Sequence, residues 1–76
     1  MKAYVFINVA PGKSSDVVSQ LRSIGGVRSA DTCWGLPDII ALVEAADMRG
    51  LQELVLDKIQ KVAGINQTET HIFLQS

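Results

Sequence analysis

Residues 35–38, Gly-Leu-Pro-Asp, place a carboxylate at the end of a stiff turn between two apolar stretches. Gly35 can adopt backbone angles closed to other residues and Pro37 fixes its own φ, so a tight turn is predicted. The Asp38 side chain has two interpretations. It either caps its own turn, or it points outward and accepts a hydrogen bond from a ligand ammonium group. In the second case, the freed backbone amides of Gly35 and Leu36 supply donors for a ligand carboxylate.

Few other side chains are candidates for binding a ligand. Thr68 and Thr70 offer hydroxyls to a ligand, although β-branched residues are also common in strands through propensity alone. Trp34 lines a pocket, packs on an edge strand or forms a contact between subunits, and we favour the contact because Trp is enriched in interfaces.

Catalysis and metal binding are not expected. Cys33 is the only cysteine and His71 the only histidine, whereas a structural zinc site needs about four ligands. We interpret Cys33 as a small buried side chain and His71 as a surface or interface residue. No nucleophile is paired with a base, so we predict no catalytic residue, no metal and no cofactor.

The turn must be held by the strands on either side of it, and the hydropathy pattern supplies them. Strands are predicted at residues 3–9, 27–34, 39–44 and 65–74. A helix lies between the first two strands, with Ser14 or Ser15 as its cap, and stops at the glycine pair 25–26.

A second helix follows the third strand, with Asp47 as its N-cap, and ends at Gly64. Six apolar residues at helical spacing predict its buried face: Met48, Leu51, Leu54, Val55, Ile59 and Val62.

The predicted order is β-α-β-β-α-β in a single domain, residues 1–76. Right-handed crossovers place both helices on one face of a four-stranded antiparallel sheet, an α+β fold of the ferredoxin-like, dimeric α+β-barrel type. Residues 3–9 and 39–44 are apolar on both faces and are predicted to be the central strands. The more polar strands, 27–34 and 65–74, are predicted to be the edges.

Helices on one face leave apolar side chains bare on the other face. Tyr4 and Phe6, or their neighbours Val5 and Ile7, would be exposed, together with one side of residues 39–43. Each large apolar side chain left in water forgoes about 1.5–3 kcal/mol. A second copy of the chain is the simplest cover. The predicted interface consists of Tyr4, Phe6, Trp34, Ile40 and Leu42.

Composition agrees with self-association and argues against other partners. The chain is 47% hydrophobic, although 76 residues bury only a small core. The formal net charge is −1 and the basic residues are scattered, which disfavours direct nucleic-acid binding. No stretch is long and apolar enough to span a membrane, and one thiol with no targeting pattern favours the cytoplasm.

The motifs resemble the effector domain of the Lrp/AsnC regulators, known as the RAM domain. The similar features are a Pro-Gly break at 11–12, the spacing Val27-x7-Gly35-x2-Asp38, and a last strand of the form Gly-Ile-x-x-Thr-x-Thr at residues 64–70. The resemblance covers essentially the whole chain. Its departures are that the sequence starts directly at the first strand, with no helix-turn-helix domain, and that Pro37 replaces a frequent aromatic residue.

The resemblance implies cytoplasmic dimers packed sheet to sheet, which assemble further into rings such as octamers or decamers. It also implies that free amino acids bind between subunits. Gly35, Leu36 and Asp38 would then form the ligand site, with Thr68 or Thr70 from either subunit. Full-length Lrp/AsnC regulators are further candidate partners.

Two other classes share this topology. Dimeric α+β-barrel monooxygenases and isomerases use lone polar side chains, and Asn8, Trp34 and His71 resemble such a set. The amino-acid-binding ACT domain has the same element order but places its ligands at side-by-side sheet edges. Because no nucleophile–base pair is present, the effector domain is the prediction and the enzyme is the alternative.

Overall fold

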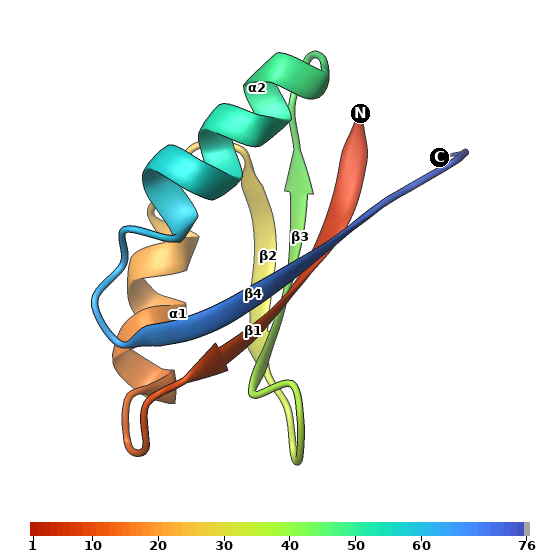
Figure 1. Cartoon of the computed structure of the whole chain (residues 1–76). Helices are drawn as coiled ribbons and strands as arrows, with labels where there is room; N and C mark the ends of the chain where they lie inside the picture. The colour runs from red at the N-terminus through yellow and green to blue at the C-terminus, as the bar shows by residue number, and fades with distance from the viewer. Residues whose placement is uncertain (76) are drawn as a thin grey trace.

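The computed structural model describes residues 1–75 and has the predicted element order (Figure 1). The elements are β1 (Lys2–Val9), α1 (Ser14–Arg22), β2 (Val27–Thr32), β3 (Ile39–Glu44), α2 (Met48–Glu53), the π-helical segment η1 (Leu54–Ile59) and β4 (Ile65–Ile72).

One four-stranded antiparallel sheet has the order β2-β3-β1-β4. The two strands that are apolar on both faces, β1 and β3, are central, as predicted. The register places Val5 opposite Ala41 on one side and Thr70 on the other. The more polar β2 and β4 form the edges, where one side of the backbone lacks a neighbouring strand.

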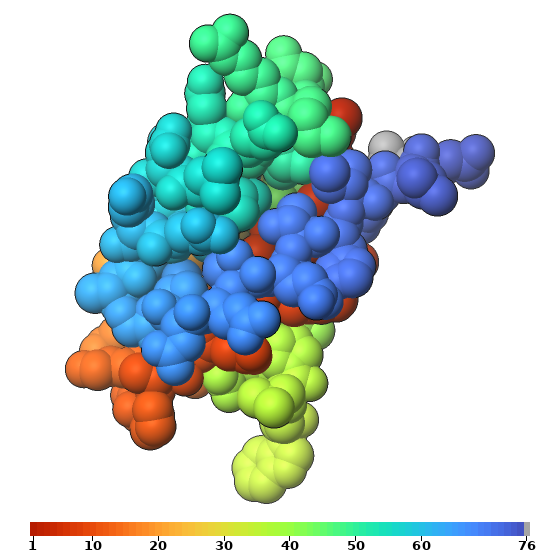
Figure 2. Space-filling view, in the orientation of Figure 1, coloured from red at the N-terminus to blue at the C-terminus, as the bar shows by residue number. Residues whose placement is uncertain are grey.

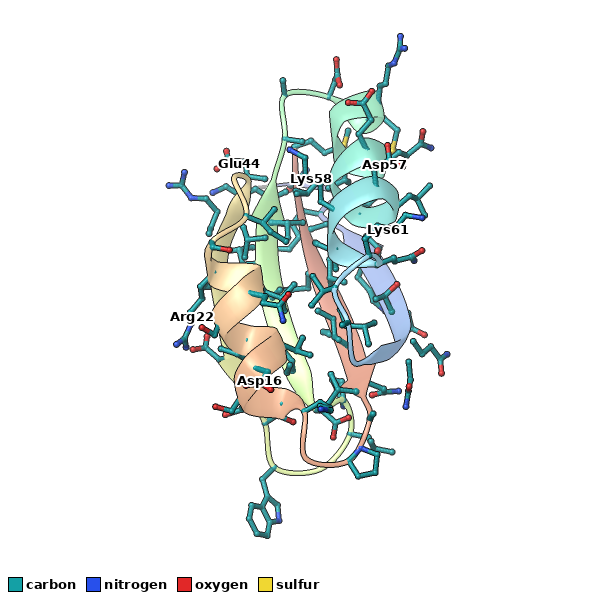
Figure 3. The ribbon with its side chains drawn as sticks, turned by 90° about the vertical axis from the view of Figure 1, so that its left-hand side faces the viewer. Asp16, Arg22, Glu44, Asp57, Lys58 and Lys61 are labelled. Carbon is teal, nitrogen blue, oxygen red and sulfur yellow. The ribbon has the colours of Figure 1, made fainter. Side chains whose placement is uncertain are left out.

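Both helices lie on the same face of the sheet (Figures 1 and 3). Alternate residues of β1 and β3 are fully buried beneath them: Ala3, Val5, Ile7, Ile39, Ala41 and Val43. The helices contribute Val17 and Leu21 from α1, and Leu51 and Ile59 from the second helical segment. Alternation of period two in the strands and the apolar stripes of the helices therefore build one core.

The two helix starts differ from each other. Asp47 caps α2 as predicted, because its side chain accepts a hydrogen bond of 2.8 Å from the Gly50 amide. The predicted cap of α1 by Ser14 or Ser15 is wrong. The helix is already entered at Lys13, whose backbone is in the right-handed helical region and whose carbonyl accepts from the Val17 amide at 3.0 Å.

The second helix contains a wider turn. The Gln60 amide donates to the Val55 carbonyl at 2.9 Å, five residues back, in place of the usual four. Leu54, Val55 and Ile59 of this segment are buried as predicted, and Val62 is partly buried against the core. Met48 is not part of that face: it is the first residue of α2 and is 42% exposed.

Both edge strands are shorter than predicted. β2 ends at Thr32, and a hydrogen bond of 2.8 Å from the Cys33 amide to the Asp38 carbonyl closes the hairpin just beyond it. β4 ends at Ile72, and Leu74 beyond it is fully exposed. Figure 2 shows both projections: the yellow-green segment between β2 and β3 extends below the body, and the blue C-terminal end extends to the side.

Candidate functional site

The turn between β2 and β3 projects from the sheet and carries exposed apolar side chains. Gly35 has a φ of +109°, the region that favours glycine, and the Leu36–Pro37 peptide bond is cis. Trp34 is fully exposed and Leu36 is 83% exposed. Neither the Gly35 amide nor the Leu36 amide donates a hydrogen bond to another group of residues 1–75. The turn therefore leaves two backbone donors without a partner among the described residues.

Asp38 anchors this turn to the end of β1. Its Oδ2 atom accepts a hydrogen bond from the Val9 amide at 2.8 Å, while its own amide donates to the Ile7 carbonyl at 3.0 Å. The carboxylate therefore accepts from a neighbouring strand rather than from an amide of its own turn. The bond engages one of the two carboxylate oxygens, and Asp38 is half-buried.

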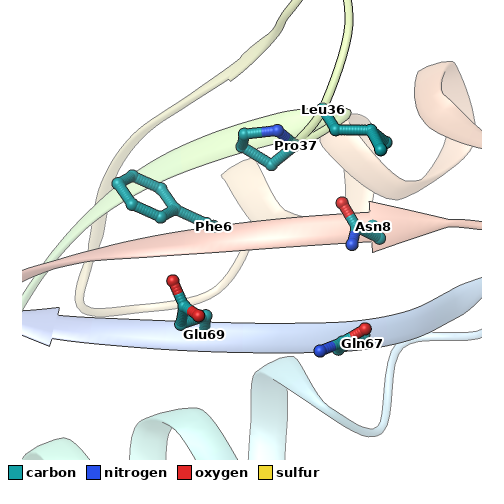
Figure 4. A pocket seen from close by; sticks show the side chains of 6 residues that line it. All are labelled: Phe6, Asn8, Leu36, Pro37, Gln67 and Glu69. Atoms are coloured by element: carbon teal, nitrogen blue, oxygen red, sulfur yellow. The ribbon is translucent and has the colours of Figure 1, made fainter.

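A pocket of about 210 Å³ lies beside the turn, on the sheet face that the helices leave uncovered (Figure 4). We call it the open-face pocket. Its walls come from β1, from the turn and from β4: Phe6, Asn8, Leu36, Pro37, Gln67 and Glu69. The register aligns the two strands here, because Phe6 is opposite Glu69 and Asn8 is opposite Gln67.

The polar side chains of this pocket are the amides of Asn8 and Gln67 and the carboxylate of Glu69. The Oδ1 atom of Asn8 is buried and has no hydrogen-bond partner within residues 1–75. Glu69 Oε1 lies 2.6 Å from Nε2 of His71, the next residue but one along β4. No lysine or arginine lines the pocket. An unpartnered buried oxygen is unusual in folded proteins.

Thr68 and Thr70 lie on the other face of the sheet. Thr68 is opposite Ile7 and Thr70 is opposite Val5, both of which are buried beneath the helices. Thr68 Oγ1 accepts a hydrogen bond of 2.8 Å from Gln60 Nε2. Thr70 lines a separate groove between the second helix and β4. Within one chain, the fold thus does not bring the threonines together with the turn.

The predicted interface residues of the strands share the uncovered face, which we call the open face. Tyr4 is opposite Leu42 and Phe6 is opposite Ile40 in the register. The Tyr4 and Phe6 rings stack with centroids 6.5 Å apart, and Phe6 lies 4.7 Å from the His71 ring. Tyr4 remains 43% exposed. Trp34 is apart from them, on the projecting turn.

Sequence reasoning named Asn8 only for the enzyme alternative, missed Gln67 and Glu69, and misjudged Cys33. Asn8 interrupts the apolar pattern of the open face, and that interruption was the available signal. Gln67 and Glu69 join it only through the β1–β4 register. Cys33 is exposed rather than buried, because it lies beyond the end of β2 at the start of the turn.

Residues 1–75 contain no group of three or more histidine, cysteine or acidic side chains able to hold a metal ion. None of the helices within this range is long and apolar enough to cross a membrane. Of the residues noted for the enzyme alternative, Asn8 and His71 share the open face, whereas Trp34 extends away from it.

Comparison with known sequences gives one consistent result. The sequence model of the Lrp/AsnC ligand binding domain matches residues 2–76. A curated HTH-type transcriptional regulator of Pyrococcus furiosus is 34% identical over 70 residues, which is 92% of this chain and 47% of the relative. The chain thus spans about half the length of the curated relatives it matches.

Solved structures share the fold. A hypothetical protein of Pyrococcus horikoshii has a TM-score of 0.90 at 28% identity, with 99% of this chain and 90% of that chain covered. A transcriptional regulator of Neisseria meningitidis, solved as its L-Met complex, has a TM-score of 0.86 at 20% identity, with 97% and 49% covered. At that identity the second likeness concerns the fold alone.

Proposed function

Because the chain belongs to the Lrp/AsnC ligand-binding domain family, we propose that it is a regulatory domain whose effector is a free amino acid. The observation that carries this proposal is the turn of residues 35–38, which combines free backbone donors with a carboxylate beside an open pocket. A free amino acid needs both kinds of group, because it carries an ammonium and a carboxylate.

In the proposed complex, the amides of Gly35 and Leu36 donate to the ligand carboxylate. Successive backbone amides in a turn form a concave site that suits an anion. The Asp38 carboxylate accepts from the ligand ammonium, a charge-assisted hydrogen bond. Its bond to the Val9 amide supports this role, since a carboxylate held by one oxygen needs little reordering when the ligand binds.

We propose that two copies stack their open faces to form a dimer. The exposed Tyr4 and the half-buried Phe6, next to Leu42 and Ile40 in the register, support this arrangement because no helix of the described chain covers them. Residual apolar surface, including the exposed Trp34, would serve further assembly into rings such as octamers or decamers. Full-length regulators with the same domain are candidate partners in such rings.

A neighbouring subunit is then required for one part of the predicted site. Thr68 and Thr70 face the helix side of their own sheet, so they would reach an effector only at the turn of another copy. Binding and assembly would be coupled if the effector contacts two subunits, because a ligand stabilises the state that it binds.

The test is a thermal-shift screen of the purified chain against single free amino acids. A ligand that binds the native state raises the melting temperature. At a hundred times its Kd, it stabilises the native state by about 2.7 kcal/mol. We expect a concentration-dependent rise for at least one amino acid. A screen in which no amino acid changes the melting temperature at millimolar concentration would contradict the proposal.

A further inference from the structure

We propose that the open-face pocket receives the side chain of the effector, and that this side chain ends in N–H donors carrying positive charge, as in lysine or arginine. This inference rests on the proposed function and specifies the class of amino acid. It depends on three pocket residues outside the turn: Asn8, Gln67 and Glu69.

The pocket and the turn are continuous. Leu36 and Pro37 belong to both, and Asp38 follows directly after Pro37. The Asp38 carboxylate accepts from the Val9 amide, and Val9 is the residue after Asn8. An amino acid held at the turn by its ammonium and carboxylate is therefore adjacent to the pocket, and its side chain can extend along β1 toward Phe6, between the stacked open faces of the proposed dimer.

The unpartnered oxygen of Asn8 defines what the pocket lacks. Buried polar atoms in proteins nearly always have a hydrogen-bond partner, and an unsatisfied acceptor is unfavourable. Figure 4 shows Asn8 between Gln67 of β4 and the residues Leu36 and Pro37 of the turn. A donor brought by the ligand satisfies this oxygen, whereas an aliphatic or carboxylate side chain leaves it unsatisfied.

Glu69 determines the preferred charge. Its carboxylate lies in the pocket wall and is oriented by the contact of 2.6 Å between Oε1 and His71 Nε2. No lysine or arginine lines the pocket, so His71 is the one basic side chain in contact with Glu69 among the described residues. An ammonium or guanidinium group is attracted there, the neutral amide of glutamine is accepted more weakly, and an anionic side chain is repelled.

The remaining walls and the size suit a long side chain. Phe6, Leu36 and Pro37 provide apolar contact for methylene groups, as they do for the stems of lysine and arginine elsewhere in proteins. The pocket volume of about 210 Å³ is below the range of about 300–1,000 Å³ typical of pockets for drug-sized ligands. It is large enough for the side chain of one amino acid.

The experiment is isothermal titration of the full chain with L-lysine, L-arginine, L-glutamine, L-leucine and L-glutamate. We expect lysine or arginine to bind most tightly and glutamate most weakly. Glu69→Gln should weaken lysine or arginine binding by about tenfold and leave glutamine binding nearly unchanged. The matched control is Glu53→Gln, which removes an exposed carboxylate paired with Arg49 and should leave all affinities unchanged.

The possible results separate the inference from the proposed function. If leucine binds as tightly as lysine and arginine, or if Glu69→Gln leaves their binding unchanged, the inference is overturned while the amino-acid effector stands. If no amino acid binds, both are overturned. The ranking of ligands by the wild-type chain decides the inference even if a variant fails to fold, and Asn8→Ala provides a second variant with the same expected direction.

Discussion

The carboxylate of Asp38 accepts a hydrogen bond of 2.8 Å from the backbone amide of Val9, across 29 positions of the chain. This bond joins the projecting turn to the end of the central strand β1. It gives Asp38 a structural task in addition to the proposed contact with a ligand ammonium. The two tasks use different properties of the side chain, its oxygen and its charge, and can be separated by substitution.

Asp38→Ala should lower the stability of the protein without ligand. It leaves the half-buried Val9 amide without its acceptor, which costs about 1–3 kcal/mol. A loss of 1 kcal/mol lowers the melting temperature of a domain this small by about 4–8 °C. Asp38→Asn retains an oxygen for the Val9 amide and should melt much closer to the wild type. Thermal unfolding of the three proteins at one concentration checks this, and equal melting temperatures would contradict it.

The open face should hold copies of the chain together. Tyr4→Glu places a charge beside the Phe6 ring on the open face and removes apolar burial in the proposed interface of about 1.5–3 kcal/mol per copy. Light scattering should show a dimer or larger assembly for the wild type and a smaller species for the variant. Leu56→Glu is the control, because Leu56 is similarly exposed but lies on the helix side. A wild-type monomer at micromolar concentration would refute the stacked-sheet arrangement.

The 76-residue chain should show no sequence-selective binding to DNA. Its seven basic residues are dispersed. Three of them are paired with acidic side chains within 4 Å, as Arg22–Asp31, Arg28–Glu44 and Arg49–Glu53. DNA affinity depends on several cations neutralising phosphates together. Gel-shift assays at physiological salt should show no complex, and a tight sequence-selective shift would count against the prediction.

Gly26→Ala should destabilise the fold more than Gly12→Ala. Both glycines have positive φ, +96° and +78°, so either alanine is strained in its backbone. At Gly26 the new Cβ would also lie 2.9 Å from Leu54 and 3.2 Å from the Glu44 carbonyl oxygen, whereas at Gly12 it meets open space. The crowding should add about 1–3 kcal/mol. Chemical denaturation of both variants measures the difference, and equal losses would disprove it.

The fold was predictable because each element has a regular local pattern. The central places of β1 and β3 followed from strands that are apolar on both faces, and the Asp47 cap from its position before a helical stripe. Strand ends were overestimated, since Cys33 and Leu74 continue an apolar composition beyond the last pairing residues.

The candidate site was predictable only where it is local. The turn of residues 35–38 was recognised from its own residues, but the partner of Asp38 lies 29 positions away in β1. The open-face pocket depends on the β1–β4 register, which aligns Asn8 with Gln67 and Phe6 with Glu69. The same register places Thr70 opposite buried Val5 and thus away from the turn. The alternation of residues within β4 alone does not show which of its two faces lies toward the helices.

The most direct test of the amino-acid effector is calorimetric titration of the amino acid found in the screen into the wild type and Asp38→Asn. Losing the charge that faces a desolvated ammonium costs about 2–5 kcal/mol, roughly 30-fold to several thousand-fold in Kd. We predict measurable binding to the wild type, a loss of this size in Asp38→Asn, and closely similar melting temperatures of the two unliganded proteins. Equal affinity of the two proteins for the amino acid would show that the Asp38 charge does not contribute to effector binding, and would contradict the proposed site.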